Sequence, residues 1–133
     1  MGFFSRDKTE PLEELRKALD QQPRDLRLLM EMGALLRQRG EREGSVDHYL
    51  QAAQLQWEAG HANKASAVAR LALQVAPGRV DAHEMLARCL EASNQIEDLR
   101  AQLRALLSLY RGSGHHDDAT RVADRLAALG PSR

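Results

Sequence analysis

The sequence predicts an all-α protein, a stack of about seven antiparallel helices, and two observations carry this prediction. The first is an internal repeat of fifty-four residues, which superposes Pro23 on Pro77 and Pro77 on Pro131, and Gly60 on Gly114. The second is the spacing of apolar residues at three- and four-residue steps, while no segment alternates with the two-residue period of a strand. A fixed period in a helical sequence is typical of a repeat protein, in which successive helices bury one another's apolar faces.

Proline and glycine residues divide the first part of the chain into helices. Pro11 suits a first helical turn, and Pro23 disfavours helix at the residue before it. Asp25 is a plausible N-cap for the second helix, which Gly40 ends, and Gly60 ends the third. Including the fourth helix, which stops before Pro77, we expect helices at residues 11–22, 25–39, 43–59 and 62–75.

The second part of the chain repeats this plan. We expect its helices at residues 80–92, 96–110 and 116–129, separated by the Ser93-Asn94 turn and by the glycines around Ser113. The middle one has the clearest amphipathic stripe, formed by Ile96, Leu99, Leu103, Leu106, Leu107 and Tyr110. We expect residues 1–10 to be a flexible tail carrying Phe3 and Phe4. Residues 11–131 are expected to form one repeat domain, with a first unit at about 24–77 and a second at about 78–131.

Composition narrows the classes of function. The chain has 133 residues with 43% hydrophobic content, enough for a continuous core. Its 19 basic and 19 acidic residues cancel, so no overall field favours nucleic acid or an anionic membrane. The single cysteine excludes an intramolecular disulfide, and the start lacks the apolar run of a secretory signal. We therefore expect a cytoplasmic protein, and the excess of arginine over lysine suggests a bacterial source.

The spacing of several residues carries a resemblance to a known family. These residues are Leu29, Met32, Gly33, Leu36, Gly40, Ser45, Tyr49 and Ala52, followed by a second register of Ala65, Ala69 and Pro77. The chain resembles the tetratricopeptide repeat over residues 26–131. The resemblance implies a right-handed superhelical stack whose concave groove accepts an extended peptide or a helix of a partner protein.

Three residues depart from the pattern of the family. Trp57 stands where the first repeat would end in proline, His83 stands at the usual tryptophan position, and Leu99 replaces a small residue. The period also exceeds the 34 residues or so of two-helix repeats. We therefore interpret each unit as three helices, in which the middle helix serves two hairpins.

The resemblance implies that the second and fifth helices line the groove. The groove positions on these helices are Arg27, Met30, Glu31, Ala34, Arg37, Asp81, Glu84, Arg88 and Glu91. Those proposed for partner binding are Arg27, Met30, Arg37, Glu84 and Arg88. A solvated face with no partner is the competing interpretation of these positions. Met30, Ala34 and Glu84 stand where the members that bind chaperone tails place a carboxylate clamp, which argues against such a clamp here.

Two arginine pairs lie one helical turn apart, Arg100 with Arg104 and Arg121 with Arg125. Such pairs could present guanidinium groups to acidic side chains of a partner, and we include Arg100 and Arg104 among the candidate binding residues. The alternative is that these arginines solubilise their helices or pair internally, for instance with Glu97.

No residue pattern indicates catalysis. The run from His115 to Asp118 contains possible zinc ligands, but adjacent residues diverge around a helix and no second cluster completes the set. Helix initiation by Asp117 and Asp118 is the better interpretation. Cys89 lies in an apolar stripe, which favours a buried structural thiol. We expect no cofactor, no metal and no enzymatic activity.

These observations favour a non-catalytic adaptor or scaffold that binds another protein. The alternative is a structural subunit that assembles with copies of itself, because the terminal helices carry Leu15, Leu19, Leu126 and Leu129. A metal hydrolase that uses His115 and His116 is a distant third hypothesis.

Overall fold

The computed structural model describes residues 10–131, and within this range it contains seven helices and no strand. The helices are α1 (Glu10–Gln21), α2 (Leu26–Gln38), α3 (Arg42–Glu58), α4 (Ala62–Val75), α5 (Val80–Ala92), α6 (Ile96–Gly112) and α7 (His116–Ala128). The all-α prediction is confirmed for this range, and every expected boundary lies within two residues of the observed one. Phe3 and Phe4 lie outside the described residues.

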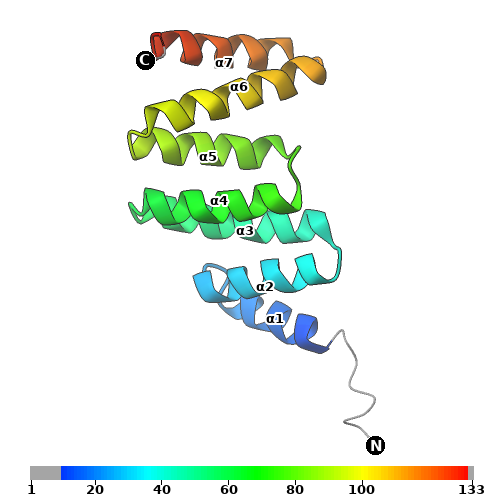
Figure 1. The fold of residues 1–133 in the computed structure, drawn as a ribbon. Coiled ribbons are helices and arrows are strands. Elements are labelled where there is room, and N and C mark those ends of the chain that lie inside the picture. The colour runs from blue at the N-terminus through cyan, green and yellow to red at the C-terminus, as the bar shows by residue number, and fades with distance from the viewer. Residues whose placement is uncertain (1–9, 132–133) are drawn as a thin grey trace, which may run out of the picture.

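The helices form a one-dimensional stack in which each helix packs against the next one in the chain (Figure 1). α1 and α7 lie at opposite ends of the stack, and the chain zigzags between them. One pair that is not consecutive, α3 and α5, is also in contact. Within residues 10–131, no helix is long and apolar enough to cross a membrane.

The lengths of the helices repeat with the sequence. α2, α3 and α4 contain 13, 17 and 14 residues, and α5, α6 and α7 contain 13, 17 and 13. The long middle helix of each unit packs against both of its neighbours in the chain.

The turns after α2 and α5 share one geometry, although they differ in sequence. Gly40 has a φ of 78° after α2, and Asn94 has a φ of 58° at the corresponding position after α5. In both turns the next backbone N–H returns to a carbonyl in the last turn of the helix, at 2.9 Å from Glu41 to Leu36 and from Gln95 to Leu90. Glycine is favoured in this left-handed conformation, and asparagine is among the few other residues that adopt it readily.

A continuous core runs through α2 to α7. Its largest fully buried side chains include Leu29, Val46, Leu90, Leu99, Leu103, Leu106 and Val122. In α4 the buried residues include Ala65, Ala69 and Ala72, whose small size lets neighbouring helices approach closely. Cys89 is also buried, as expected. α1 is held by a smaller cluster formed by Leu12, Met32 and Leu36.

The crossing of α2 and α3 is especially close. A Cβ atom added at Gly33 would lie 2.8 Å from two ring carbons of Tyr49, so only glycine leaves room for this ring. Ser45 adds a hydrogen bond at the same place, because its Oγ donates to the Gly33 carbonyl at 2.7 Å. Fifty-four residues later, these three positions are Ala87, Leu99 and Leu103, and all three side chains are buried.

Candidate binding groove

A groove of about 1050 Å³ lies between α3 and α5, and we call it the α3–α5 groove. α3 and α5 lie side by side because both pack against α4, which connects them. α2 contributes Leu29 to the lining, and α6 contributes Tyr110. The remaining apolar lining residues are Pro23, Leu50, Leu55, Val80 and Met85.

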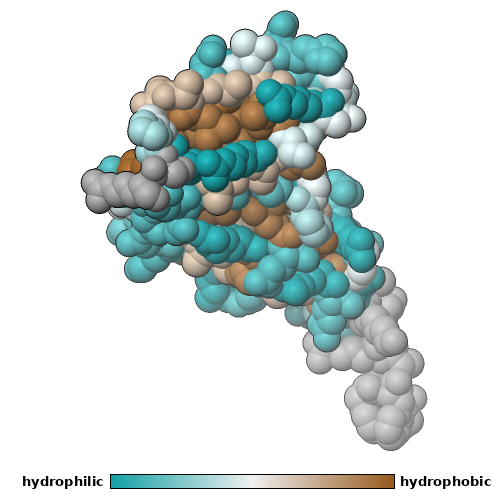
Figure 2. Space-filling view, turned by 45° about the horizontal axis from the view of Figure 1, so that its top comes forward, coloured by the Kyte–Doolittle hydropathy of each residue, from teal (hydrophilic) through white to brown (hydrophobic). Residues whose placement is uncertain are grey.

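The floor of the groove is apolar and partly exposed. Leu50, Leu55 and Val80 are half-buried and pack on the core, whereas Met85 beneath them is buried. On α5, Asp81, Glu84, Met85 and Arg88 recur at three- and four-residue steps, so they share one helix face and all line the groove. In the space-filling view, apolar surface lies between polar side chains on the visible face of the molecule (Figure 2).

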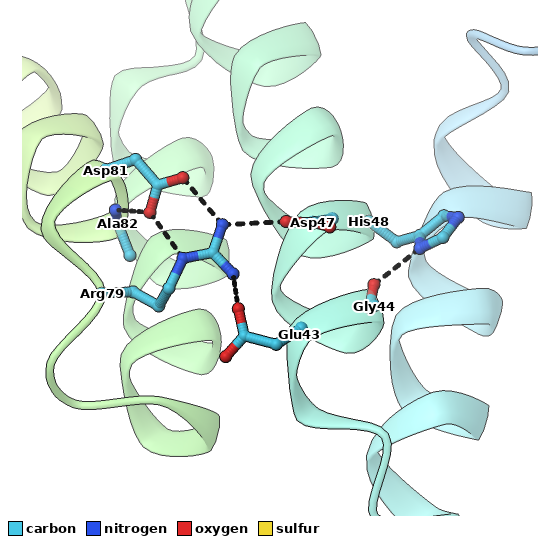
Figure 3. A network of polar contacts seen from close by, with 7 residues as sticks. All are labelled: Glu43, Gly44, Asp47, His48, Arg79, Asp81 and Ala82. Carbon is cyan, nitrogen blue, oxygen red and sulfur yellow. Dashed lines mark hydrogen bonds and ion pairs between the residues drawn. The ribbon is translucent and has the colours of Figure 1, made fainter.

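One end of the groove is built around Arg79, in the loop before α5 (Figure 3). Its guanidinium donates to Asp81 through Nε at 2.9 Å and through Nη2 at 2.8 Å. It also donates to Glu43 and to Asp47 of α3, each at 2.8 Å. Three carboxylates from two helices therefore surround one arginine.

The carboxylates cover this cation from solvent. The Arg79 side chain is 21% exposed, whereas those of Glu43, Asp47 and Asp81 are 78%, 56% and 57% exposed. The hydrogen bonds from Arg79 hold the pKa of Asp81 below its ordinary value, and the same bonds raise the pKa of Arg79. The cluster therefore presents carboxylate oxygen outward.

The other end of the groove has a different character. The guanidinium carbon of Arg88 lies 4.4 Å from the centroid of the Trp57 ring, which is a cation–π contact. Arg24 forms an ion pair with Glu58 at 2.6 Å. Hydrogen bonds from Gln54 and then from Arg24 lower the pKa of Glu58.

Glu84 joins three helices beside the floor. It accepts a hydrogen bond from the Tyr110 hydroxyl at 3.1 Å and one from Arg125 of α7 at 3.3 Å. Burial raises the pKa of Tyr110, and the charge of Glu84 adds to this effect. Tyr110 therefore remains a protonated donor, and the contacts tie Glu84 to α6 and α7.

No protein-family model and no curated protein matches this chain.

Two of the candidate binding residues, Glu84 and Arg88, line the α3–α5 groove. Three others on α2 do not: Arg27 pairs with Glu31 on its own helix at 2.7 Å, Met30 packs on the core and Arg37 is exposed elsewhere. The opposite wall of the groove is α3, whose residues were not among the candidates.

Arg100 and Arg104, proposed as a pair that presents guanidinium groups to a partner, differ in exposure. Arg104 is exposed, but Arg100 is only 5% exposed and donates from Nη1 to the Gly130 carbonyl at 2.6 Å. Its Nε lies 3.5 Å from Glu97, which agrees with the alternative of internal pairing. The physical reason is that the Gly130 carbonyl, which follows the end of α7, lies outside the hydrogen bonds of the helix, and Arg100 supplies a donor to it.

The second arginine pair is engaged within the protein. Arg121 pairs with Asp118 on α7, and Arg125 pairs with Glu84. Among residues 10–131, no group of three or more histidine, cysteine or acidic side chains is placed to hold a metal ion. His115 instead stands at the N-cap of α7, with its ring nearly perpendicular to that of Tyr110 and the two centroids 6.2 Å apart.

The sequence predicted Asp81 as a groove position but did not indicate the cluster around Arg79. Its local signal was an arginine after a Pro-Gly turn and two residues before an aspartate. The other two carboxylates come from α3, more than thirty residues earlier in the chain. Only the packing of α3 against α5 brings them to Arg79.

Proposed function

We propose that this protein is a non-catalytic cytoplasmic adaptor that binds a peptide or helix of a partner protein in the α3–α5 groove. The observation that carries the proposal is the partly exposed floor of Leu50, Leu55 and Val80, in a groove of about 1050 Å³. An apolar concave surface with a few charged groups at its margins is the usual form of a binding site.

We further propose that the stack belongs to the tetratricopeptide type. The supporting observations are the residue spacing described above and the repetition of helix lengths in the two units. In such a stack each helix is partly covered by its neighbours, and the groove is the surface left for a partner.

Affinity capture with mass spectrometry tests the proposed groove. The tagged wild-type protein is compared with Leu50→Glu, which places a charge on the floor, and with the control Leu71→Glu. Leu71 is also half-buried but lies on α4 outside the groove. Circular dichroism and melting establish that both variants are folded. We expect a partner that is lost with Leu50→Glu and kept with Leu71→Glu, and a partner that both folded variants keep would contradict the proposal.

Self-assembly is the second candidate function. Leu15 and Leu19 in α1, Leu126 in α7 and Leu129 directly after α7 are only half-buried at the two ends of the stack. A surface on one end that fits the other end produces a head-to-tail assembly. Light scattering over a wide range of protein concentration tests this candidate, and a constant monomer mass would exclude it.

A further inference from the structure

We infer that the α3–α5 groove selects a cationic apolar peptide, with aliphatic side chains on the floor and an arginine or lysine against Glu43 and Asp47. This inference rests on the proposed function, because it names the chemistry of the partner for the same groove. It depends on the arrangement of charge at the two ends of the groove.

The cluster around Arg79 presents negative charge to a bound segment. One guanidinium faces three carboxylates, so the cluster has a formal charge of −2. The cation is 21% exposed and every carboxylate is more than half exposed. A segment that reaches this end of the groove therefore meets carboxylate oxygen before it meets Arg79.

The carboxylates retain acceptor capacity, whereas Arg79 has little donor capacity left. In the hydrogen bonds to Arg79, Glu43 uses only Oε2 and Asp47 uses only Oδ1 (Figure 3). Arg79 itself directs Nε, Nη1 and Nη2 toward carboxylates. An arginine or lysine on a partner would supply donors to the remaining oxygens, whereas an acidic group would be repelled.

The charge of Arg88, at the opposite end of the groove, determines where along the groove the basic side chain of the peptide binds. Asp81 and Arg88 are seven residues apart on α5, which corresponds to about 10 Å along a helix. This distance is about the Debye length at 0.1 M salt, so the two ends act separately on a bound segment. Arg88 disfavours a second cation at its own end. We therefore expect one basic end followed by about three extended residues that cover the floor.

Selection from a displayed library of random twelve-residue peptides tests the inference. The full chain serves as the target, and recovered peptides are synthesised and titrated by fluorescence anisotropy. We expect groove-dependent peptides to carry arginine or lysine at one end beside aliphatic residues. The double variant Glu43→Gln with Asp47→Asn should weaken their binding about tenfold, since two exposed ion pairs are lost.

A matched control removes the same charge elsewhere. Asp98→Asn with Asp124→Asn alters two exposed aspartates outside the groove and should leave the affinity unchanged. A second measurement needs no variant: raising the salt from 0.05 M to 0.5 M should weaken a cationic peptide about fivefold.

The outcomes separate this inference from the proposed function. Peptides that lose binding with Leu50→Glu but are neutral or acidic, or are insensitive to salt and to the double variant, would overturn the cationic selection alone. Failure to recover any peptide that is sensitive to Leu50→Glu would overturn both the selection and the groove as a binding site.

Discussion

The two units place different side chains at the same helix crossing. In the first unit Gly33 lies against the ring of Tyr49, and the Ser45 hydroxyl bonds to the Gly33 carbonyl. In the second unit the positions of Gly33 and Tyr49 are taken by Ala87 and Leu103, both buried. A smaller residue on the first helix accompanies a larger one on the second. The comparison indicates compensation in size within this pair of positions, whereas the third position changes from Ser45 to the larger Leu99, which is also buried.

The largest effect on stability is expected for a charge introduced at Leu103, the residue of the second unit that corresponds to Tyr49. Leu103 is 1% exposed, so Leu103→Asp would bury an unpaired charge. Its cost of several kcal/mol, set against a total stability of about 5–15 kcal/mol, should unfold the stack. Circular dichroism and thermal melting measure this effect. Arg104→Asp, at the exposed neighbouring position, should melt almost like the wild type. Unchanged melting of Leu103→Asp would show that α6 does not bury this face.

A smaller effect on stability is expected for a methyl group added at Gly33 of the first unit. Gly33→Ala places a methyl group 2.8 Å from the Tyr49 ring and should lower the free energy of unfolding by about 1–3 kcal/mol. Combining it with Tyr49→Leu should cost less than the sum of the two single changes, because the smaller side chain makes room. Urea denaturation of all three variants measures this coupling.

Gly112→Ala is the control for helix propensity, since its added Cβ meets no atom within 4 Å and it should be neutral or slightly stabilising. Additive costs for Gly33→Ala and Tyr49→Leu would refute the account of the crossing.

The smallest effect concerns acid and the Arg79 cluster, which joins α3 of the first unit to the start of the second unit. Asp47 contributes to the Arg79 cluster, whereas the corresponding residue of the second unit is Ala101. The pKa of Asp81 lies below its usual value of about 3.9, so its stabilising contribution is present above pH ~4 and is lost as the pH falls through the lowered pKa. For such exposed pairs we expect about 1 kcal/mol or less.

Asp81→Asn should therefore melt below the wild type at pH 7 and differ less from it at pH 3. An equal difference in melting temperature at the two pH values would contradict this assignment.

The helix boundaries could be predicted because local chemistry determines them. Gly40, Gly60 and Asn94 adopt left-handed backbone conformations that end their helices, and Pro77 interrupts the pattern between the units. The end of α6 was expected at Tyr110 but lies two residues later, before the left-handed Gly114. A difference of two residues is within the range over which helix ends fray.

The groove was predicted only in part, because its walls depend on tertiary packing. The spacing of residues along α5 predicted that Glu84 and Arg88 line the groove. The facing wall is α3 and not α2, and the sequence pattern of α2 gave no indication of this. The burial of Arg100 could have been predicted from the repeat, because its counterpart in the first unit is the apolar residue Val46, which is fully buried. Comparison of the two units would have placed this arginine inside the protein.

The contact between Arg88 and Trp57 has a practical consequence. Trp57 is the chain's single tryptophan, and the guanidinium over its ring belongs to a residue that lines the groove. A bound segment that draws Arg88 away changes the surroundings of the indole and hence its emission. The protein thus contains its own optical reporter of groove occupancy, which responds to any segment that moves Arg88 and requires no added label.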